Sequence, residues 1–333
     1  MEFALSEEQA ELAATVRALL DKRADSAAVR AASTSATGHD EALWQTLCEQ
    51  IGVAALAVPE AYDGVGASFF ETAVVLEELG RTIAPSPLLA TTVATEALLA
   101  GGTEEAKARL LPRLAAGEIG TLALDDGPVL DADRSAIVLA VHGDDLVEVT
   151  GARARWVASM DQSIRLGRID LDGVDGVTVT VVGDGAAARA RAELVGAAAV
   201  AALAVGLADR ALRMTVDYAK ERVQFGRPIG SFQALKHRMA DVLARLELSR
   251  SASWAASYAL ADPAADPDEA AFLTHAAAAY ALDTAHLAAS ECVQLHGGIA
   301  ITWEHDAHLV FKRAHALGRL YGAPHHHRAA VGL

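Results

Sequence analysis

The sequence predicts a mostly helical α+β protein with an N-terminal helical domain, a small middle β domain and a C-terminal four-helix bundle. Apolar residues recur at helical spacing in the first and last parts of the chain, whereas short runs of Val, Ile and Leu alternate with Asp and Gly turns between them. Hydrophobic residues make up 52% of the chain but aromatic residues only 5%, a composition that favours close-packed helices of Ala, Leu and Val. We place the domains at residues 1–118, 119–187 and 188–333.

The N-terminal domain is expected to contain five helices. The first begins with Ser6 and Gln9 at the spacing of a capping box, in which each side chain accepts a backbone N–H of the other residue. Proline and glycine residues separate the periodic segments that follow. The predicted helices are Ser6–Lys22, Glu41–Gln50, Ser68–Leu79, Leu88–Ala100 and Glu104–Ala116.

The middle domain is expected to be a small β module. Four runs rich in Val, Ile and Leu are separated by turn signals such as Asp125-Asp126-Gly127 and Gly143-Asp144-Asp145. The change from helical to strand-like period marks the limits of this module. The predicted strands are Gly120–Leu124, Ala136–Val141, Leu146–Thr150 and Val177–Val182.

Helical periodicity returns after Ala187 and predicts four long helices that pack as a bundle. The most apolar window, Leu194–Ala208, is fifteen residues long, which is shorter than the ~20 residues needed to cross a bilayer. We therefore expect a buried helix there and no membrane contact. The Pro- and Asp-rich segment 261–268 is expected to be an exposed turn. The predicted helices are 190–221, 231–261, 267–296 and 304–321.

The chain is strongly acidic, with 28 Lys and Arg against 44 Asp and Glu and a formal net charge of −16. Such a surface repels phosphate backbones and anionic lipids, so nucleic acid is not expected as a partner. Two distant cysteines, Cys48 and Cys292, exclude a disulfide framework and suit a reducing cytoplasm. The N-terminal residues lack the pattern of a secretory signal, so we expect a cytoplasmic protein.

Other chemistry-bearing side chains are interpreted as structural. The run His325-His326-His327 diverges on a helix and does not converge, so we predict no metal site. His237 and the two cysteines are expected to pack within helical apolar patterns. A basic stretch near the C-terminus is either a salt-bridged face or a phosphate-binding surface, and it consists of Arg313, Arg319 and Arg328.

Two segments carry residue types suited to binding a nucleotide. In the first, Arg222 can offer a planar guanidinium to a pyrophosphate, Gln224 can hydrogen-bond a ribose or base edge, and Phe225 can pack on an adenine. In the second, Gln294 is an additional donor, and the paired glycines Gly297-Gly298 let backbone N–H groups approach a phosphate closely. Each segment alone is also compatible with a plain structural element, an inter-helix turn or a glycine helix stop.

Together, the two segments resemble the acyl-CoA dehydrogenase family of flavoenzymes. The motifs R-x-Q-F-G-x-P-I-x-x-F-Q and Q-x-H-G-G lie 72 residues apart, counted from Arg222 to Gln294. The resemblance extends to Val58-Pro59-Glu60, to Glu77-Glu78-Leu79-Gly80-Arg81 and to Thr302–Asp306, and so covers nearly the whole chain. The family fold has the same order of helical, β and helical domains.

The resemblance implies an FAD-dependent dehydrogenation of an acyl-CoA thioester, in which a carboxylate removes the α-proton and the β-hydrogen leaves as hydride to the flavin. It also implies an electron-transfer flavoprotein or a similar electron acceptor. By resemblance, six residues hold the ADP half of an FAD that belongs to the neighbouring subunit. They are Arg222, Gln224, Phe225, Gln294, Gly297 and Gly298.

The catalytic carboxylate of the family is missing from both places where members carry it. Where the family has Tyr-Glu-Gly near the C-terminus, this chain has Leu320-Tyr321-Gly322, and no acidic residue follows Asp306. The other place, 26 residues before Arg222, is Gly196. Glu193 lies almost one helical turn away and is the alternative base, although a carboxylate near a helix start is also typical of a solvent-facing residue. We therefore assign no catalytic residue.

The β module departs from the family as well. The segment Leu122–Val129 lacks the Thr-Glu-Pro and Gly-Ser-Asp motifs that hold the flavin ring and thioester in the family. We therefore predict a subunit that is active with an unlike, complete subunit, similar to the heterotetrameric acyl-CoA dehydrogenases of actinobacterial sterol side-chain degradation, with a steroid thioester as candidate substrate. The alternatives are a self-sufficient homomeric dehydrogenase that uses Glu193 and a non-catalytic scaffold subunit.

Overall fold

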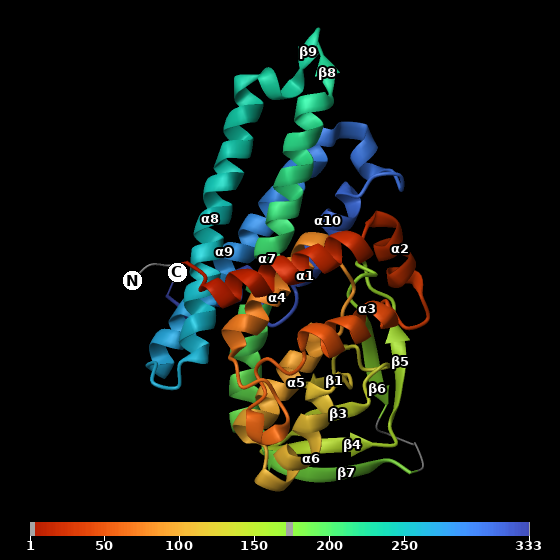
Figure 1. Cartoon of the computed structure of the whole chain (residues 1–333), viewed down its shortest axis with the longest axis vertical. Coiled ribbons are helices and arrows are strands. Elements are labelled where there is room, and N and C mark those ends of the chain that lie inside the picture. Colours follow the sequence, from red (N-terminus) through yellow and green to blue (C-terminus); the bar gives the residue numbers. More distant parts are fainter. Residues whose placement is uncertain (1–3, 171–175, 333) are drawn as a thin grey trace.

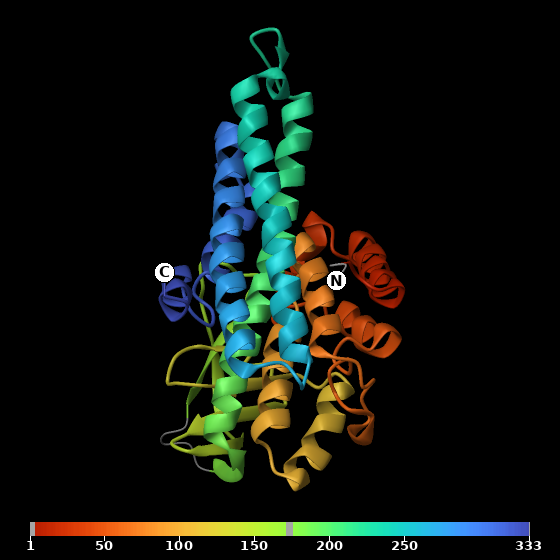
Figure 2. The same ribbon diagram turned by 90° about the vertical axis from the view of Figure 1, so that its left-hand side faces the viewer.

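The computed structural model describes residues 4–170 and 176–332. A helical bundle runs along the long axis of the molecule, and the N-terminal helices and the sheets pack around its lower half (Figure 1). The hairpin between the first two long helices of the bundle lies at the far tip, away from the sheets (Figure 2). The predicted mostly helical α+β class is confirmed.

The N-terminal part is built from helices that pack across the bundle. The capping box predicted at Ser6 is confirmed: its Oγ accepts from the N–H of Gln9 (3.2 Å), and its N–H donates to Gln9 Oε1 (2.9 Å). The second helix was not predicted, because its nine residues are too few to establish a period and bury only Val29 and Ala32. The helices are α1 (Glu7–Arg23), α2 (Ser26–Thr34), α3 (Glu41–Thr46), α4 (Phe69–Thr82), α5 (Leu88–Gly101) and α6 (Glu104–Ala115).

The described residues between 119 and 184 build two small sheets. The four predicted strands form one of them; they are β1 (Gly120–Ala123), β3 (Ile137–His142), β4 (Asp145–Thr150) and β7 (Thr178–Asp184). Their order is β1-β3-β4-β7, in which only the β1–β3 pair is parallel. The second sheet is antiparallel, with the order β2-β6-β5, and was missed because its strands are short or carry arginines in place of apolar runs. They are β2 (Val129–Leu130), β5 (Arg153–Val157) and β6 (Leu166–Asp170).

The C-terminal part contains three long helices and shorter ones. The long helices are α7 (Gly185–Glu221), α8 (Gln233–Ala261) and α9 (Pro267–His296); the short ones are α10 (Ala307–Leu317) and α11 (Pro324–Ala330). The two-stranded hairpin of β8 (Val223–Gln224) and β9 (Arg227–Pro228) joins α7 to α8. The fourth bundle helix is shorter than predicted, because arginines from α2 and α7 hold Asp306 before it begins and Gly318 follows its end.

Helix α7 is the core helix of the molecule. By length and composition it could cross a membrane, but 89% of its most apolar window is buried inside the protein, and no other helix in the described ranges passes the same test. The apolar window predicted to be buried, Leu194–Ala208, lies within it. The hydrophobicity of this segment therefore serves packing.

Helices α4 and α7 cross so closely that their backbones touch. A Cβ at Gly206 would collide with the carbonyl oxygen of Glu77, and a Cβ at Gly80 would collide with the carbonyl oxygen of Leu203. Glycine at both positions removes the side chains that would otherwise keep the helices apart. The crossing therefore joins the N-terminal domain to the bundle at the level of the backbone.

Paired buried charges surround this crossing. Three donors from α4 and α8 converge on the carboxylate of Glu77: Arg81 (2.6 Å), Arg250 (3.0 Å) and Trp254 (3.2 Å). The neighbouring carboxylate of Glu78 pairs with Arg17 of α1 (2.7 Å), and Arg81 also pairs with Asp209 of α7. Matching each buried carboxylate with donors offsets the cost of its burial. The segment Glu77–Arg81, which carried part of the family resemblance, is thus the joint between four helices.

We expect Gly206→Ala to lower the free energy of unfolding by about 2–4 kcal/mol, because the added methyl group must displace the backbone of α4. In an unconstrained helix the same substitution would stabilise the protein. Urea unfolding followed by circular dichroism measures the effect. Gly318→Ala is the matched control, since a Cβ there meets only ordinary contacts. Equal unfolding midpoints for Gly206→Ala and the wild type would contradict the close crossing.

Candidate functional site

The hairpin at the tip of the bundle carries three of the predicted binding residues. Arg222 follows the last turn of α7, and Gln224 pairs with Arg227 in the short ladder. Phe225 and Gly226 form the two-residue turn with φ of 53° and 76°, a backbone region that a side chain such as Phe rarely adopts. Phe225 is 93% exposed. The tip therefore presents its side chains outward.

Arg227 and Phe232 belong to the same surface, although the sequence analysis did not select them. The guanidinium carbon of Arg227 lies 4.1 Å from the ring centroid of Phe232, and the ring of Phe225 meets Phe232 edge-on at 6.2 Å. These contacts hold the hairpin against the start of α8. Both residues belong to the same sequence motif as Phe225, and this position in the motif is the feature that could have pointed to them.

The second predicted segment lies at the end of α9. Gln294 is exposed on the last turn, and the helix ends where Gly297 adopts a φ of 64°. A Cβ on Gly297 or Gly298 would meet no atom within 4 Å, so the space beside both residues is open. A 3₁₀ turn, η4 (Gly297–Ile301), follows. The glycine backbone is thus accessible to a ligand from outside the chain.

A stacked pair of rings places the two segments at the same end of the bundle. Tyr218, in the last turn of α7, and His296, the last residue of α9, have ring centroids 4.4 Å apart at an interplanar angle of 28°. Arg222 follows one turn after Tyr218, and Gly297 follows His296 directly. All six predicted residues are exposed on this chain. A ligand held by them would stay open to solvent unless another molecule covered it.

The two positions that lack a carboxylate meet in the fold. The ring of Tyr321 packs against Gly196 so closely that a Cβ there would overlap it. The φ of Tyr321 is 51°, in the left-handed region. Glu193 is close by on α7, but its side chain is 57% exposed and its carboxylate lies 3.5 Å from the guanidinium of Arg189. The position at Gly196 is therefore filled by a phenol ring.

A cleft of about 480 Å³ opens beside these residues. Leu122 and Leu124 contribute an apolar wall, and Glu193 lines another side. His275 and His327 also line it, with their Nδ1 atoms 3.0 Å apart. Burial lowers the pKa of His327 to about 4, so its ring is neutral at pH 7. The cleft has the size of a small-molecule pocket.

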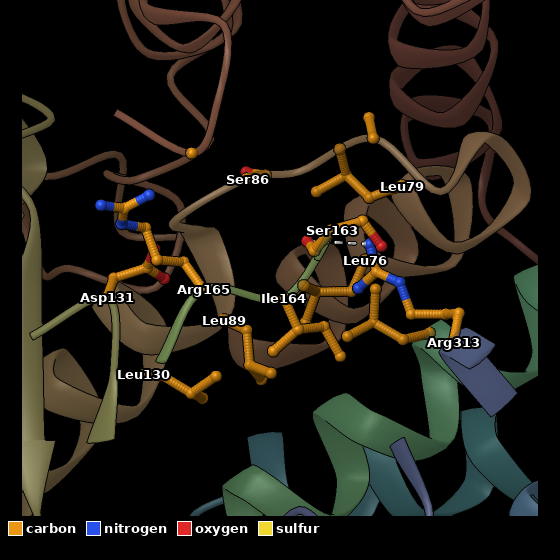
Figure 3. A pocket seen from close by; sticks show the side chains of 13 residues that line it. Leu76, Leu79, Ser86, Leu89, Leu130, Asp131, Ser163, Ile164, Arg165 and Arg313 are labelled. Carbon is orange, nitrogen blue, oxygen red and sulfur yellow. Dashed lines mark hydrogen bonds between the residues drawn. The ribbon is translucent and has the colours of Figure 1, made fainter. Parts of the chain in front are cut away.

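The interior between the sheets, α4, α5 and α7 is nearly filled. One cavity there, lined by Leu76, Leu89 and Leu203, has a volume of about 30 Å³, room for about one water molecule. Figure 3 shows Asp131 and Arg165 on one side and Arg313 on the other, where Arg313 donates to the carbonyl of Ser163 (3.4 Å). Burial and the charge of Asp133 raise the pKa of Asp131 to about 7, against the opposing charges of Arg165 and Arg313. Such a carboxyl is a candidate acid or base, but no substrate fits beside it.

The histidines interpreted as structural have different environments. Among the three consecutive residues, His327 points inward, whereas His325 and His326 are exposed. The expectation that His237 packs in the interior is wrong: it is exposed, because the first turns of α8 extend toward the tip beyond the N-terminal helices (Figure 2). Within residues 4–170 and 176–332, no group of three His, Cys, Asp or Glu is arranged to hold a metal ion.

The cysteines and the basic stretch have structural surroundings. Burial raises the pKa of the Cys48 thiol to about 12 and that of Cys292 to about 11, so both are protonated at neutral pH and poor nucleophiles. Arg313 is buried and pairs with Asp161 (3.2 Å), and Arg328 pairs with Asp283 (2.5 Å). Arg319 lines the cleft. Two of the three arginines are thus salt-bridged.

Comparison with protein families identifies the class. The description "Acyl-CoA dehydrogenase, N-terminal domain" matches residues 6–118, and "Acyl-CoA dehydrogenase, C-terminal domain" matches residues 183–332. The chain belongs to the acyl-CoA dehydrogenase family. The predicted family is therefore confirmed, and with it the predicted cofactor class, FAD.

Individual members of the family and solved structures are also similar to this chain. Acyl-CoA dehydrogenase IpdE2 of Mycobacterium tuberculosis is 47% identical over 319 residues, which cover 96% of this chain and 94% of that protein. IpdE2 of Mycolicibacterium smegmatis is 43% identical and covers 96% of both. A Tcur3481–Tcur3483 steroid ACAD variant superposes with a TM-score of 0.86 at 29% identity, over 98% of this chain and 97% of that chain. The ChsE4–ChsE5 complex from Mycobacterium tuberculosis has the same fold, with a TM-score of 0.88 at 24% identity, over 100% of this chain and 98% of that one.

The two halves of FAD fit this chain unequally. At the tip, a guanidinium and a carboxamide are donors suited to a pyrophosphate, the space beside the two glycines is open, and an exposed aromatic ring suits an adenine. In the interior, a cavity of about 30 Å³ is too small for a flavin ring. At the cleft, Tyr321 fills the space beside Gly196.

We expect Asp131→Asn to stabilise the fold at pH 8 and to leave its stability unchanged near pH 4. A carboxyl whose pKa in the folded protein is raised to about 7 favours folding only while it is protonated. The contribution of Asp131 to the free energy of unfolding is therefore lost as the pH rises from about 4 through 7. Asn resembles the protonated acid and tolerates the φ of 50° at this position. Urea unfolding at both pH values should show a gain of about 2–4 kcal/mol at pH 8. Equal destabilisation at both would contradict this assignment.

Proposed function

We propose that this chain is a subunit of an FAD-dependent acyl-CoA dehydrogenase that works with an unlike partner subunit. In this proposal its exposed tip residues hold the ADP half of a flavin whose ring lies in the partner, and the partner supplies the carboxylate base. The substrate is a CoA thioester, with a steroid that has a shortened side chain as the candidate acyl group. The relative described as a steroid ACAD supports this class. An electron-transfer flavoprotein or a similar protein accepts the electrons.

One observation carries the proposal: the two halves of the site lie far apart on one helix. Gly196 and Arg222 are 26 residues apart within and at the end of α7, which is about 39 Å at 1.5 Å per residue. A single flavin cannot reach from Arg222 to the surroundings of Gly196 in the same chain. A cofactor whose ADP half lies at Arg222 therefore has its ring in another chain.

The surface around the tip supports a partner that covers it. Phe225 is 93%, Ile301 78% and Trp303 70% exposed, which is unusual for large apolar side chains. An unlike partner is favoured over a second copy of this chain, because neither Gly196 nor Tyr321 can act as the base.

The part of this chain in the reaction is binding and orientation. When bound, the flavin accepts the β-hydrogen of the thioester as hydride. Arg222 would neutralise the pyrophosphate beside the exposed turn of Gly297-Gly298, with Gln294 as a further donor; Gln224 would hydrogen-bond the nucleoside. The Phe225 ring would cover the adenine. None of these groups needs to transfer a proton.

A second candidate function is a self-sufficient homomeric dehydrogenase with Glu193 as base. The cleft of about 480 Å³ that Glu193 lines favours it, because this space is large enough for a ligand. Two observations weigh against it: the carboxylate is largely exposed and paired with Arg189, and the ring of Tyr321 fills the space beside Gly196.

We expect the chain purified alone to carry little flavin, and co-expression with a complete acyl-CoA dehydrogenase subunit to restore flavin absorbance and thioester oxidation. The reason is that this chain offers only the ADP half of the site. Absorbance near the flavin bands and dye reduction with a steroid acyl-CoA measure the two effects. Full flavin occupancy and turnover by the isolated chain would reject the proposal.

Glu193→Gln in the co-expressed preparation separates the two candidate functions. Under our proposal turnover stays within about twofold of the wild type, since an exposed paired carboxylate has no part in the reaction. Under the homomeric alternative, the same change abolishes turnover and leaves the flavin bound.

We expect Arg222→Ala to weaken FAD binding by the co-expressed assembly about 10- to 100-fold, because a charge-assisted hydrogen bond to the pyrophosphate is lost. Flavin release measured by fluorescence during dialysis gives the affinity. Lys220→Ala, an exposed cation in the last turn of the same helix, is the matched control and should leave the affinity unchanged. An Arg222→Ala assembly with wild-type affinity would favour the scaffold interpretation.

A further inference from the structure

The turn that carries Gly297 and Gly298 is held at both of its ends by aromatic rings. Before the turn, His296 is only 4% exposed and stacks on Tyr218. After the turn, the ring centroid of His305 lies 4.4 Å from that of His296. Tyr218, His296 and His305 therefore form a ring stack at the base of the glycine turn, in which the ring of His305 is tilted by 48° against that of His296.

Hydrogen bonds fix the orientation of both imidazoles. Nδ1 of His296 lies 2.7 Å from the carbonyl oxygen of Cys292, which can only accept, so Nδ1 carries the proton. Nδ1 of His305 accepts the N–H of Ala307 (3.1 Å), so its proton is on Nε2. Burial lowers the pKa of both rings, which are therefore neutral at pH 7. Two uncharged rings can stack without mutual repulsion.

Asp306, directly after His305, anchors the same end of the turn to two other helices. Its Oδ1 accepts hydrogen bonds from Ser26 (2.6 Å) and Arg30 (2.7 Å) of α2, and its Oδ2 accepts one from Arg210 of α7 (2.9 Å). Burial would raise the pKa of Asp306, but these donors hold it below its ordinary value. The turn therefore cannot shift without breaking charge-assisted hydrogen bonds.

We infer that Tyr218, His296 and His305 are positioning residues for the nucleotide: the ring stack holds the end of α7, with Arg222, in fixed register with the exposed turn of Gly297-Gly298, in which the N–H of Gly297 is held by the carbonyl of Val293. This inference rests on the proposed function. Donors that are already in place bind a pyrophosphate without a further cost of ordering the chain. The rings lie at the base of the turn, so they act on the nucleotide only by positioning the backbone of Gly297-Gly298.

Four variants separate positioning from simple stability. Tyr218→Phe keeps a flat ring on His296, whereas Tyr218→Leu fills similar space without one. Leu246→Ala removes a buried side chain of α8 about 20 Å along the helix from the tip, and so lowers stability without touching the stack. His305→Ala opens the stack from its other end.

Titration of the full chain with ADP by calorimetry tests the inference. We expect about three- to tenfold weaker ADP binding for Tyr218→Leu and for His305→Ala, and less than about twofold change for Tyr218→Phe and Leu246→Ala. His305→Ala decides the outcome if Tyr218→Leu does not fold. Wild-type ADP affinity in both stack variants would overturn the inference, as would an equal loss in Leu246→Ala.

Hydrogen exchange at the amide of Gly297, whose N–H donates to the carbonyl of Val293, gives a readout that needs no nucleotide. The stack predicts faster exchange in Tyr218→Leu but wild-type exchange in Tyr218→Phe and Leu246→Ala. If the wild-type chain does not bind ADP, alone or co-purified with a partner, the proposed function fails and this exchange pattern still decides the positioning role. Equal exchange in all variants overturns it.

Discussion

The backbone contact between α4 and α7 is the constraint on which the other parts of the structure depend. Gly80 and Gly206 let the two helices touch, and the buried carboxylates around them are matched by arginines from α1, α4, α7 and α8. Because α7 is one continuous helix of 37 residues, a crossing in its middle fixes both of its ends. The sheets lie toward one end and the hairpin lies at the other (Figure 1). The cleft is lined by Arg189 and Glu193, in the first turns of α7 at the end near the sheets. The length of α7 therefore sets the distance between Gly196 and Arg222.

The surroundings of Arg222 and those of Gly196 differ in how they are filled. The tip around Arg222 and Gly297 is open, with donors and large apolar side chains exposed to solvent. At Gly196 the ring of Tyr321 fills the position of a catalytic carboxylate, and a cleft of about 480 Å³ opens beside it. Under the proposed function, an open nucleotide site needs a partner to cover it, and a position filled by a phenol ring leaves no room for a catalytic carboxylate. Both properties support the proposal that this chain completes the cofactor site of another subunit.

Much of the fold was predictable because it follows local periodicity and capping. The first capping box, the four strands of the larger sheet and the three long helices of the bundle all leave a period in the sequence. The missed elements are α2 and the strands β2, β5 and β6, which bury few side chains of their own and depend on neighbours for stability. For the site, the motif residues could be named from the sequence. Arg227 and the ring stack could not be selected, because their importance comes from contacts with Phe232 and between α7, α9 and the segment that follows α9.

The sequence by itself determined the fold class, the motifs that carry the family resemblance and the absence of a carboxylate at both family positions, because these depend only on which residue stands where. Only the tertiary structure decided that Tyr321 meets Gly196, that Tyr218 meets His296 and that the tip is exposed while the interior is closed. These contacts join residues 125 and 78 positions apart. Local propensity has a range of a few residues, whereas such pairs meet only after helices have packed, and the packing is set by the glycine crossing of α4 and α7.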